Sequence, residues 1–173
     1  GLYRALLTTR GEQTIMASVG GLSDSYSAPV SVSPNIYQRL VIVAPGESLD
    51  SGSLELPGKI GDPTTQDAGS PFDVQVYATD FYFNPIDVSS PVLPIDFDFS
   101  CTDAQAALPA GTQTLLSNTA SFPVTLLTLA DPAEQLVRVD EVGQPVSGST
   151  LIPIEAGVID HFDIGVDNAT NPD

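Results

Sequence analysis

The sequence predicts an all-β protein, a sandwich of two sheets with about seven strands in a unit of roughly 120 residues. Short runs of alternating apolar and polar residues recur along the chain, which is typical of strands with one face on a core. The 15 prolines and 14 glycines are spread over the 173 residues, which favours many turns and few helices. The sequence also contains an internal repeat, which predicts that the chain spans parts of more than one such unit.

The predicted strands follow one another with turn signals between them. They cover residues 30–32, 40–43, 72–78, 95–99, 122–129 and 136–139. In 72–78 and 95–99 the alternation is strict, so Phe72, Val74 and Val76 are expected on the core and Asp73 in solvent. Residues 46–70 predict either a functional loop or an irregular turn with one short strand at 54–56. Residues 102–108, closed by a proline, predict a turn or a single 3₁₀ turn.

The end of the chain repeats its beginning at a constant offset. Ile152 and Ile154 stand 122 positions after Val30 and Val32 (152 − 30 = 122), and residues 162 and 164 repeat 40 and 42 in the same way. A period of this size fits a whole domain. The prediction is three segments: 1–27 as the C-terminal strands of a preceding repeat, 28–149 as a complete repeat, and 150–173 as the N-terminal strand or strands of a following one.

The run of residues 68–86, AGSPFDVQVYATDFYFNPI, resembles the AG-x-x-F-x-V-x-V-x-A-x-D-x-x-x-N-P signature of bacterial immunoglobulin-like (Big or filamin-like) tandem repeats. Residues 97–103, 107–109, 122–126 and 134–140 resemble later motifs of the same family in the expected order, and residues 10–17 resemble its closing hairpin. The resemblance implies an immunoglobulin-like β-sandwich in a secreted or cell-surface protein, with neighbouring repeats as partners.

The charge balance is strongly acidic, with 22 acidic residues against 5 basic ones and a formal net charge of −17. Such a surface repels phosphate backbones, so the sequence predicts no nucleic-acid binding. No apolar stretch reaches the ~20 residues of a membrane span, so no membrane insertion is expected.

Catalytic groups are sparse, and the chain is not expected to be an enzyme. Cys101 is the only cysteine and His161 the only histidine, and the two fall in different predicted repeats. Asp96 and Asp98 share one strand face, where two carboxylates could serve a glycosidase. The alternative is a polar outer face opposite Phe97 and Phe99.

The acidic residues also suggest a calcium site. Asp80, Asn84, Asp87 and Asp103 offer the hard oxygen ligands that Ca²⁺ takes. The alternative is that Asp80 and Asn84 bond their own backbone and shape the turn after the strand. No cofactor is required by the sequence, and calcium is the one candidate.

Phe81, Tyr82 and Phe83 form the densest aromatic cluster. If they are exposed, they are candidate ligand-binding residues that stack on a glycan or pack on a neighbouring domain. The alternative is a plug over the end of the sandwich.

Taken together, these features favour a structural or adhesive immunoglobulin-like module of an extracellular bacterial surface protein or filament. Its expected partners are neighbouring repeats or identical subunits, with a glycan or a host surface as a further candidate. Two alternatives stay open: a carbohydrate-binding accessory module of a secreted enzyme, and a filament subunit completed by strand complementation.

Overall fold

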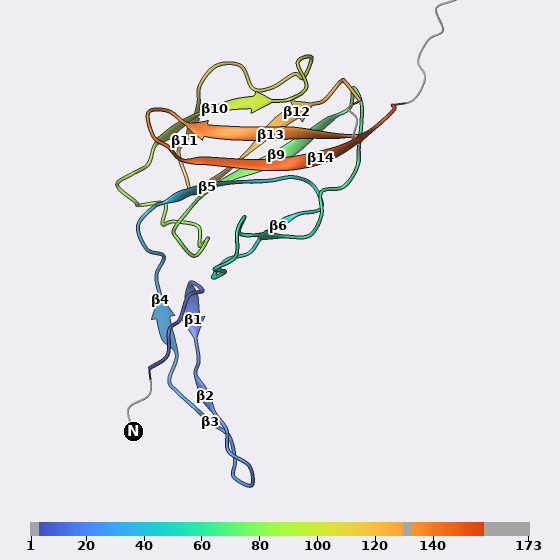
Figure 1. The fold of residues 1–173 in the computed structure, drawn as a ribbon. Coiled ribbons are helices and arrows are strands. Elements are labelled where there is room, and N and C mark those ends of the chain that lie inside the picture. The colour runs from blue at the N-terminus through green and yellow to red at the C-terminus, as the bar shows by residue number, and fades with distance from the viewer. Residues whose placement is uncertain (1–3, 130–132, 158–173) are drawn as a thin grey trace, which may run out of the picture.

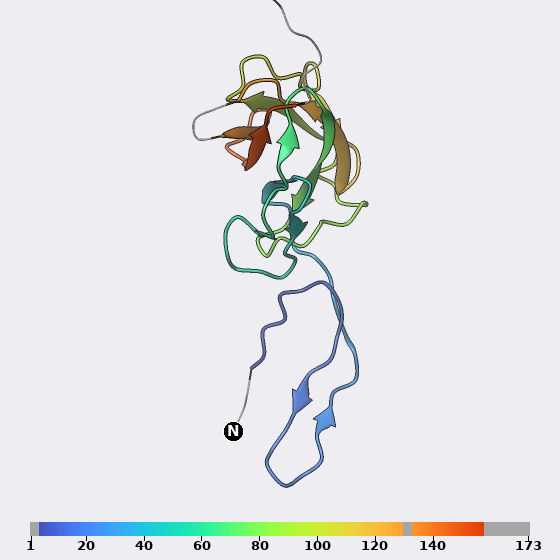
Figure 2. The same ribbon diagram turned by 90° about the vertical axis from the view of Figure 1, so that its right-hand side faces the viewer.

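The computed structural model describes residues 4–129 and 133–157, and within these ranges every helix or strand assigned is a β-strand. Figure 1 shows a main body from which a narrow hairpin near the N-terminus projects, and the quarter-turn view of Figure 2 shows the same separation. The all-β prediction is therefore confirmed for the described part of the chain.

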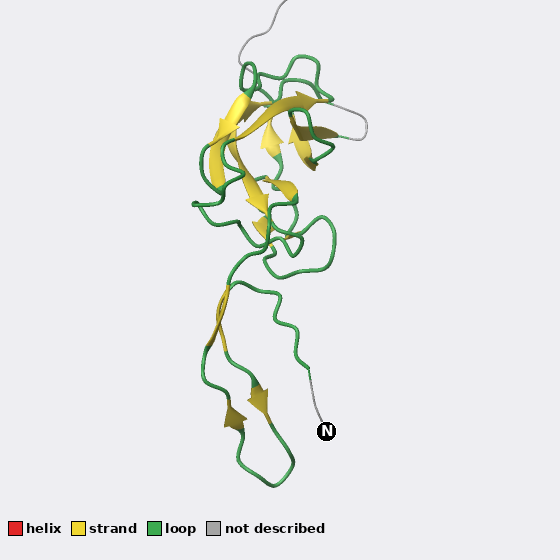
Figure 3. Ribbon diagram, turned by 90° about the vertical axis from the view of Figure 1, so that its left-hand side faces the viewer, coloured by secondary structure: helices red, strands yellow, loops and turns green. Residues whose placement is uncertain are grey.

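Two sheets make up the main body, and Figure 3 shows their strands in yellow. The first has three strands in the order β12 (Thr119–Thr125), β9 (Pro71–Thr79) and β5 (Arg39–Val43). The second is curled and has five, in the order β11 (Gln113–Leu115), β10 (Ile95–Cys101), β13 (Glu134–Glu141), β14 (Ser147–Glu155) and β8 (Gln66–Asp67). Neighbours are antiparallel except β14 and β8. A small hairpin of β6 (Ser48–Leu49) and β7 (Lys59–Ile60) lies outside both sheets.

One hydrophobic core is shared by the two sheets. The predicted inward faces are confirmed: Val74 and Val76 of β9 are fully buried, as is Phe97 of β10, while Asp73 is exposed. The Phe97 ring packs against the Phe122 ring of β12 at 5.4 Å between centroids. The buried members of this core come from seven strands and three loop positions: Leu40, Ile42, Ala44, Val74, Val76, Ala78, Ile86, Ile95, Phe97, Leu115, Val124, Leu126, Val137, Val139, Ile152 and Ile154.

The strand predictions are largely confirmed, with two corrections. The short strand considered at 54–56 does not form: Glu55 lies in a bend and Leu56 in a turn, and Leu54 and Leu56 are exposed. The strand expected to reach residue 129 ends at Thr125, because the chain then turns to meet Asp103. Residues 102–108 contain turns and no helix, as predicted.

The projecting hairpin spans residues 11–32. Its strands β1 (Gly11–Gln13) and β4 (Val30–Val32) pair near the main body, and β2 (Met16–Ala17) and β3 (Ser25–Tyr26) pair further out. Strand β4 thus groups with the hairpin across the boundary predicted after residue 27. Likewise β14 runs through the boundary predicted after residue 149, and its distal half contributes to the core of the main body.

The two sheets come close together where β5 faces β14. A Cβ atom added at Gly148 of β14 would lie 2.6 Å from the Leu40 carbonyl oxygen of β5, so only glycine fits there. Within the described residues no β-ladder joins these two strands. Their facing backbone groups therefore need another partner.

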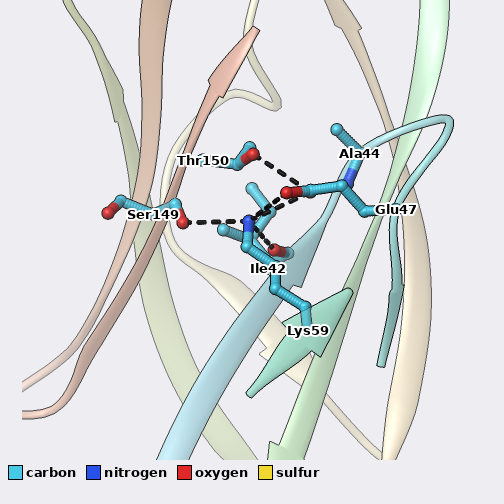
Figure 4. A network of polar contacts seen from close by, with 6 residues as sticks. All are labelled: Ile42, Ala44, Glu47, Lys59, Ser149 and Thr150. Atoms are coloured by element: carbon cyan, nitrogen blue, oxygen red, sulfur yellow. Dashed lines mark hydrogen bonds and ion pairs between the residues drawn. The ribbon is translucent and has the colours of Figure 1, made fainter. Parts of the chain in front are cut away.

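Lys59 supplies that partner (Figure 4). Its ammonium donates to the Ile42 carbonyl of β5 at 3.1 Å and to the Ser149 carbonyl of β14 at 3.2 Å. It also pairs with the Glu47 carboxylate at 2.8 Å, both side chains being almost fully buried. Glu47 in turn accepts from the Ala44 backbone N–H and from the Thr150 hydroxyl. Burial lowers the pKa of Lys59, and the adjacent Glu47 carboxylate opposes that shift.

We expect replacement of Lys59 by methionine to destabilise the protein by about 3–5 kcal/mol, because it leaves the buried Glu47 carboxylate without its cation. Urea unfolding measures the loss. The double variant Lys59→Met/Glu47→Gln should recover part of it. The matched control is Arg138→Met, which breaks the exposed Arg138–Asp140 pair and should change little. A loss of stability in Lys59→Met no larger than that in Arg138→Met would show that the buried network is dispensable.

Candidate functional site

The turn that follows β9 is organised by the carboxylate of Asp80. One oxygen accepts the backbone N–H groups of Tyr82 and Asn84, each at 2.9 Å. The other accepts the backbone N–H of Asn35, also at 2.9 Å, from the linker between the hairpin and β5. Asp80 and Asn84 are both buried. The carboxylate is therefore surrounded by N–H donors, the arrangement expected of a residue that shapes a turn.

Asn84 connects this turn to the segment that precedes the hairpin. Its Oδ1 accepts the backbone N–H of Arg10 at 2.9 Å, and its Nδ2 donates to the Thr8 carbonyl at 2.8 Å. The amide thus pairs with the backbone on both sides of Thr9, as a neighbouring strand would. The Arg10 guanidinium adds a third bond, to the Pro85 carbonyl at 2.6 Å.

A second turn, which contains Gly52, packs against Thr9 in the same segment. A Cβ atom at Gly52 would overlap the Thr9 side chain, so Thr9 packs directly on the glycine backbone. The Gly52 N–H donates to the Tyr82 carbonyl at 2.7 Å, which joins the two turns. We call the set Gly52, Asp80, Asn84 and Pro85 the junction socket, because it receives the chain on either side of the hairpin.

The aromatic cluster is divided between core and surface. Phe83 is buried against Val41 and Val43 on the outer face of β5, with a backbone in the left-handed region at φ 59°. Phe81 is 43% exposed, and its ring stands at 88° to that of Tyr82. Perpendicular rings do not present one flat surface to a sugar. The Arg39 guanidinium lies over both the Phe81 and Phe83 rings, at 4.8 and 4.5 Å.

The structure does not bring the four candidate calcium ligands together. Among the described residues, no three acidic, histidine or cysteine side chains gather closely enough to hold a metal ion. Asp103 lies in a turn after β10, where its carboxylate accepts backbone N–H groups from Leu127 and Thr128 at 2.6 and 2.9 Å. Asp87 is exposed in the loop between β9 and β10.

The remaining candidate chemical groups are also separate. Asp96 and Asp98 lie on the exposed face of β10, where each accepts a threonine hydroxyl from the β11 region at 2.7 Å. Burial raises the pKa of the Cys101 thiol, which disfavours the nucleophilic thiolate. His161 lies outside the described residues.

The hairpin β1–β4 repeats the register of β13 and β14. Glu12 pairs with Ser31 and Gln13 with Val30, while Glu134 pairs with Pro153 and Gln135 with Ile152. Each of these four positions is displaced by 122 (134 − 12 = 122; 153 − 31 = 122). Further out the hairpin slips by one residue, since Met16 pairs with Tyr26 whereas Arg138 pairs with Ser149.

The burial of the two hairpins differs although their register agrees. Val30 is 42% exposed, whereas its counterpart Ile152 is fully buried. Ile15 is 41% exposed, and its counterpart Val137 is fully buried. The projecting hairpin therefore carries the inward-facing apolar pattern of a core hairpin without a core against it.

Sequence reasoning found Asp80 and Asn84 but missed their partners. Thr8 and Arg10 lie more than 70 positions away along the chain, and Gly52 falls in a segment without a regular pattern.

Neither the known protein-family models nor the curated protein sequences match this chain. Among the described residues there is no helix long and apolar enough to cross a membrane.

We expect Asp103→Asn to destabilise the protein by about 1–3 kcal/mol at neutral pH, because one amide oxygen cannot accept all the N–H groups that the carboxylate accepts. Burial raises the pKa of Asp103, but its backbone hydrogen bonds outweigh burial and hold the pKa below 3.8. Its contribution is thus complete above pH 3.8 and lost as the pH falls through the lower folded-state value. Urea unfolding at several pH values should show the two proteins converging in acid; a constant difference would contradict this account.

We expect neither Ca²⁺ nor EDTA to change the melting temperature, because the Asp80 oxygens face N–H donors that a cation would have to displace. Thermal unfolding of metal-stripped protein with and without Ca²⁺ tests this. A rise with Ca²⁺ that disappears in Asp87→Asn would instead place a calcium site at the loop that follows the turn.

Proposed function

We propose that the chain is a structural segment of a tandem array of immunoglobulin-like repeats, serving as a spacer or adhesive module of an extracellular bacterial surface protein or filament. The carrying observation is the hairpin β1–β4, which has the register of β13–β14 at an offset of 122. We infer that it is the closing hairpin of a preceding repeat.

The pattern of exposure supports this reading. A lone two-stranded hairpin is at best marginally stable in water, and its apolar face is expected to be covered. The residues that lack a cover, among them Ile15 and Val30, correspond to buried residues of the main body. Strands equivalent to β5, β9 and β10 of a preceding repeat would supply that cover.

The main body supports the immunoglobulin-like part of the proposal. Its sheets of three and five strands share one core and are mostly antiparallel, as in a β-sandwich. The net charge of −17 favours solubility and self-repulsion between the modules of an extended array. The proposal assigns no catalytic role.

A filament of strand-complemented subunits is the second candidate, since the same uncovered hairpin face would fit an identical subunit. In that case protection of the hairpin from hydrogen exchange would increase with protein concentration. A glycan-binding role has less support, because the exposed aromatic rings are perpendicular.

A strand graft tests the proposed equivalence. Residues 134–137 are replaced by 12–15 and residues 152–154 by 30–32, so that the hairpin strands enter the main body in the observed register. We expect a cooperatively folded protein that loses only about 1–3 kcal/mol, because the core exchanges are mainly between valine and isoleucine. Urea unfolding measures the difference.

The matched control grafts residues 13–16 and 31–33 into the same positions. A shift by one residue turns the apolar side chains outward, so the control should lose cooperative unfolding. A graft that is no more stable than this control would overturn the equivalence of the two hairpins.

A further inference from the structure

We propose that the junction socket is a latch that sets the angle between consecutive repeats, and that its partner is the segment of residues 8–10, which leads into the closing hairpin of the preceding repeat. This inference rests on the proposed function. On this proposal, the turn from Asp80 to Asn84 acts as an interface between repeats.

The socket holds the hairpin at both of its ends. Arg10 directly precedes β1, and its backbone N–H is bound by Asn84. Asn35 follows β4 after a short link, and its backbone N–H is bound by Asp80. Asp80 and Asn84 also bond to each other at 3.1 and 3.2 Å, so one buried unit carries both attachments. Two attachment points restrict rotation that a single linker would allow.

The partner is recognised mainly through its backbone. Asn84 binds the Thr8 carbonyl and the Arg10 N–H, and Thr9 packs on Gly52 with no room for a larger residue there. Arg10 is the one side chain in this segment that adds a hydrogen bond, to the Pro85 carbonyl. The latch therefore fits an extended segment with an arginine at its third position.

Separation of the hairpin would leave the socket incompletely bonded. The Asn84 amide is buried, and its Oδ1 is bonded to the Arg10 N–H. Separation would exchange these hydrogen bonds for bonds to water at a net cost in free energy, so the latched arrangement is favoured over a freely swinging hairpin.

Spin-label distance measurements on the whole chain test the latch. Labels are placed at Ser23→Cys in the hairpin loop and at Leu116→Cys on the main body, in a Cys101→Ser background. We expect one narrow distance distribution. Asn84→Ala, which removes both bonds to the backbone of residues 8–10, should replace it with a broad one, whereas Thr14→Ala in the hairpin should not.

Arg10→Pro provides a second variant, because it removes the N–H donor and the guanidinium without altering the main body. It keeps the test informative if Asn84→Ala does not fold, which circular dichroism will show. A broad distribution in the parent protein, or a narrow one in folded Arg10→Pro, would overturn the latch. The strand graft tests the proposed function separately from the latch. A stable graft with a broad distance distribution in the parent protein would mean an array with flexible junctions. A failed graft with a narrow distribution would mean a fixed hairpin that is not part of a repeat.

Discussion

The hydrogen bonds that Lys59 makes to β5 and β14 join the two sheets of the main body. Strands β5 and β14 lie side by side without a ladder, and Gly148 allows their backbones to come close. The ammonium bonds a carbonyl on each strand, and Glu47 compensates its charge. Because a buried ion pair gains little net energy after desolvation, its main effect is to give the Ile42 and Ser149 carbonyls a hydrogen-bond donor and the Glu47 carboxylate a cation.

The contact between β5 and β14 through Lys59 also positions the junction socket. Lys59 belongs to β7, and the turn before it contains Gly58, where a Cβ atom would overlap the Phe83 ring. Phe83 belongs to the turn organised by Asp80, and Gly52 of the same outer loop binds the Tyr82 carbonyl. The loop fastened by Lys59 therefore supports the two turns that hold the hairpin. Residues 46–70, the least regular part of the sequence, connect the core to the junction.

The turn from Asp80 to Asn84 had two interpretations from the sequence, a calcium site or a turn bonded to backbone, and the local sequence does not decide between them. Aspartate oxygens suit Ca²⁺ and backbone N–H groups equally well, and only the surroundings distinguish them. Around Asp80 the neighbours are donors, including one from Asn35, which lies 45 positions away. The aromatic run was ambiguous for a similar reason, since exposure of Phe81 and burial of Phe83 depend on loops that have no sequence period.

Six of the strands and the inward faces of β9 and β10 could be predicted from the sequence, because alternation with period two places Val74, Val76 and Phe97 on one side wherever the strand lies. The sequence also determined the repeat, whose offset of 122 reappears in the pairing of Gln13 with Val30 and of Gln135 with Ile152. The partners of Lys59, Asp80 and Asn84 become visible only in the folded structure. These contacts join residues far apart in the chain through single polar atoms, and such contacts leave no periodic trace in the sequence.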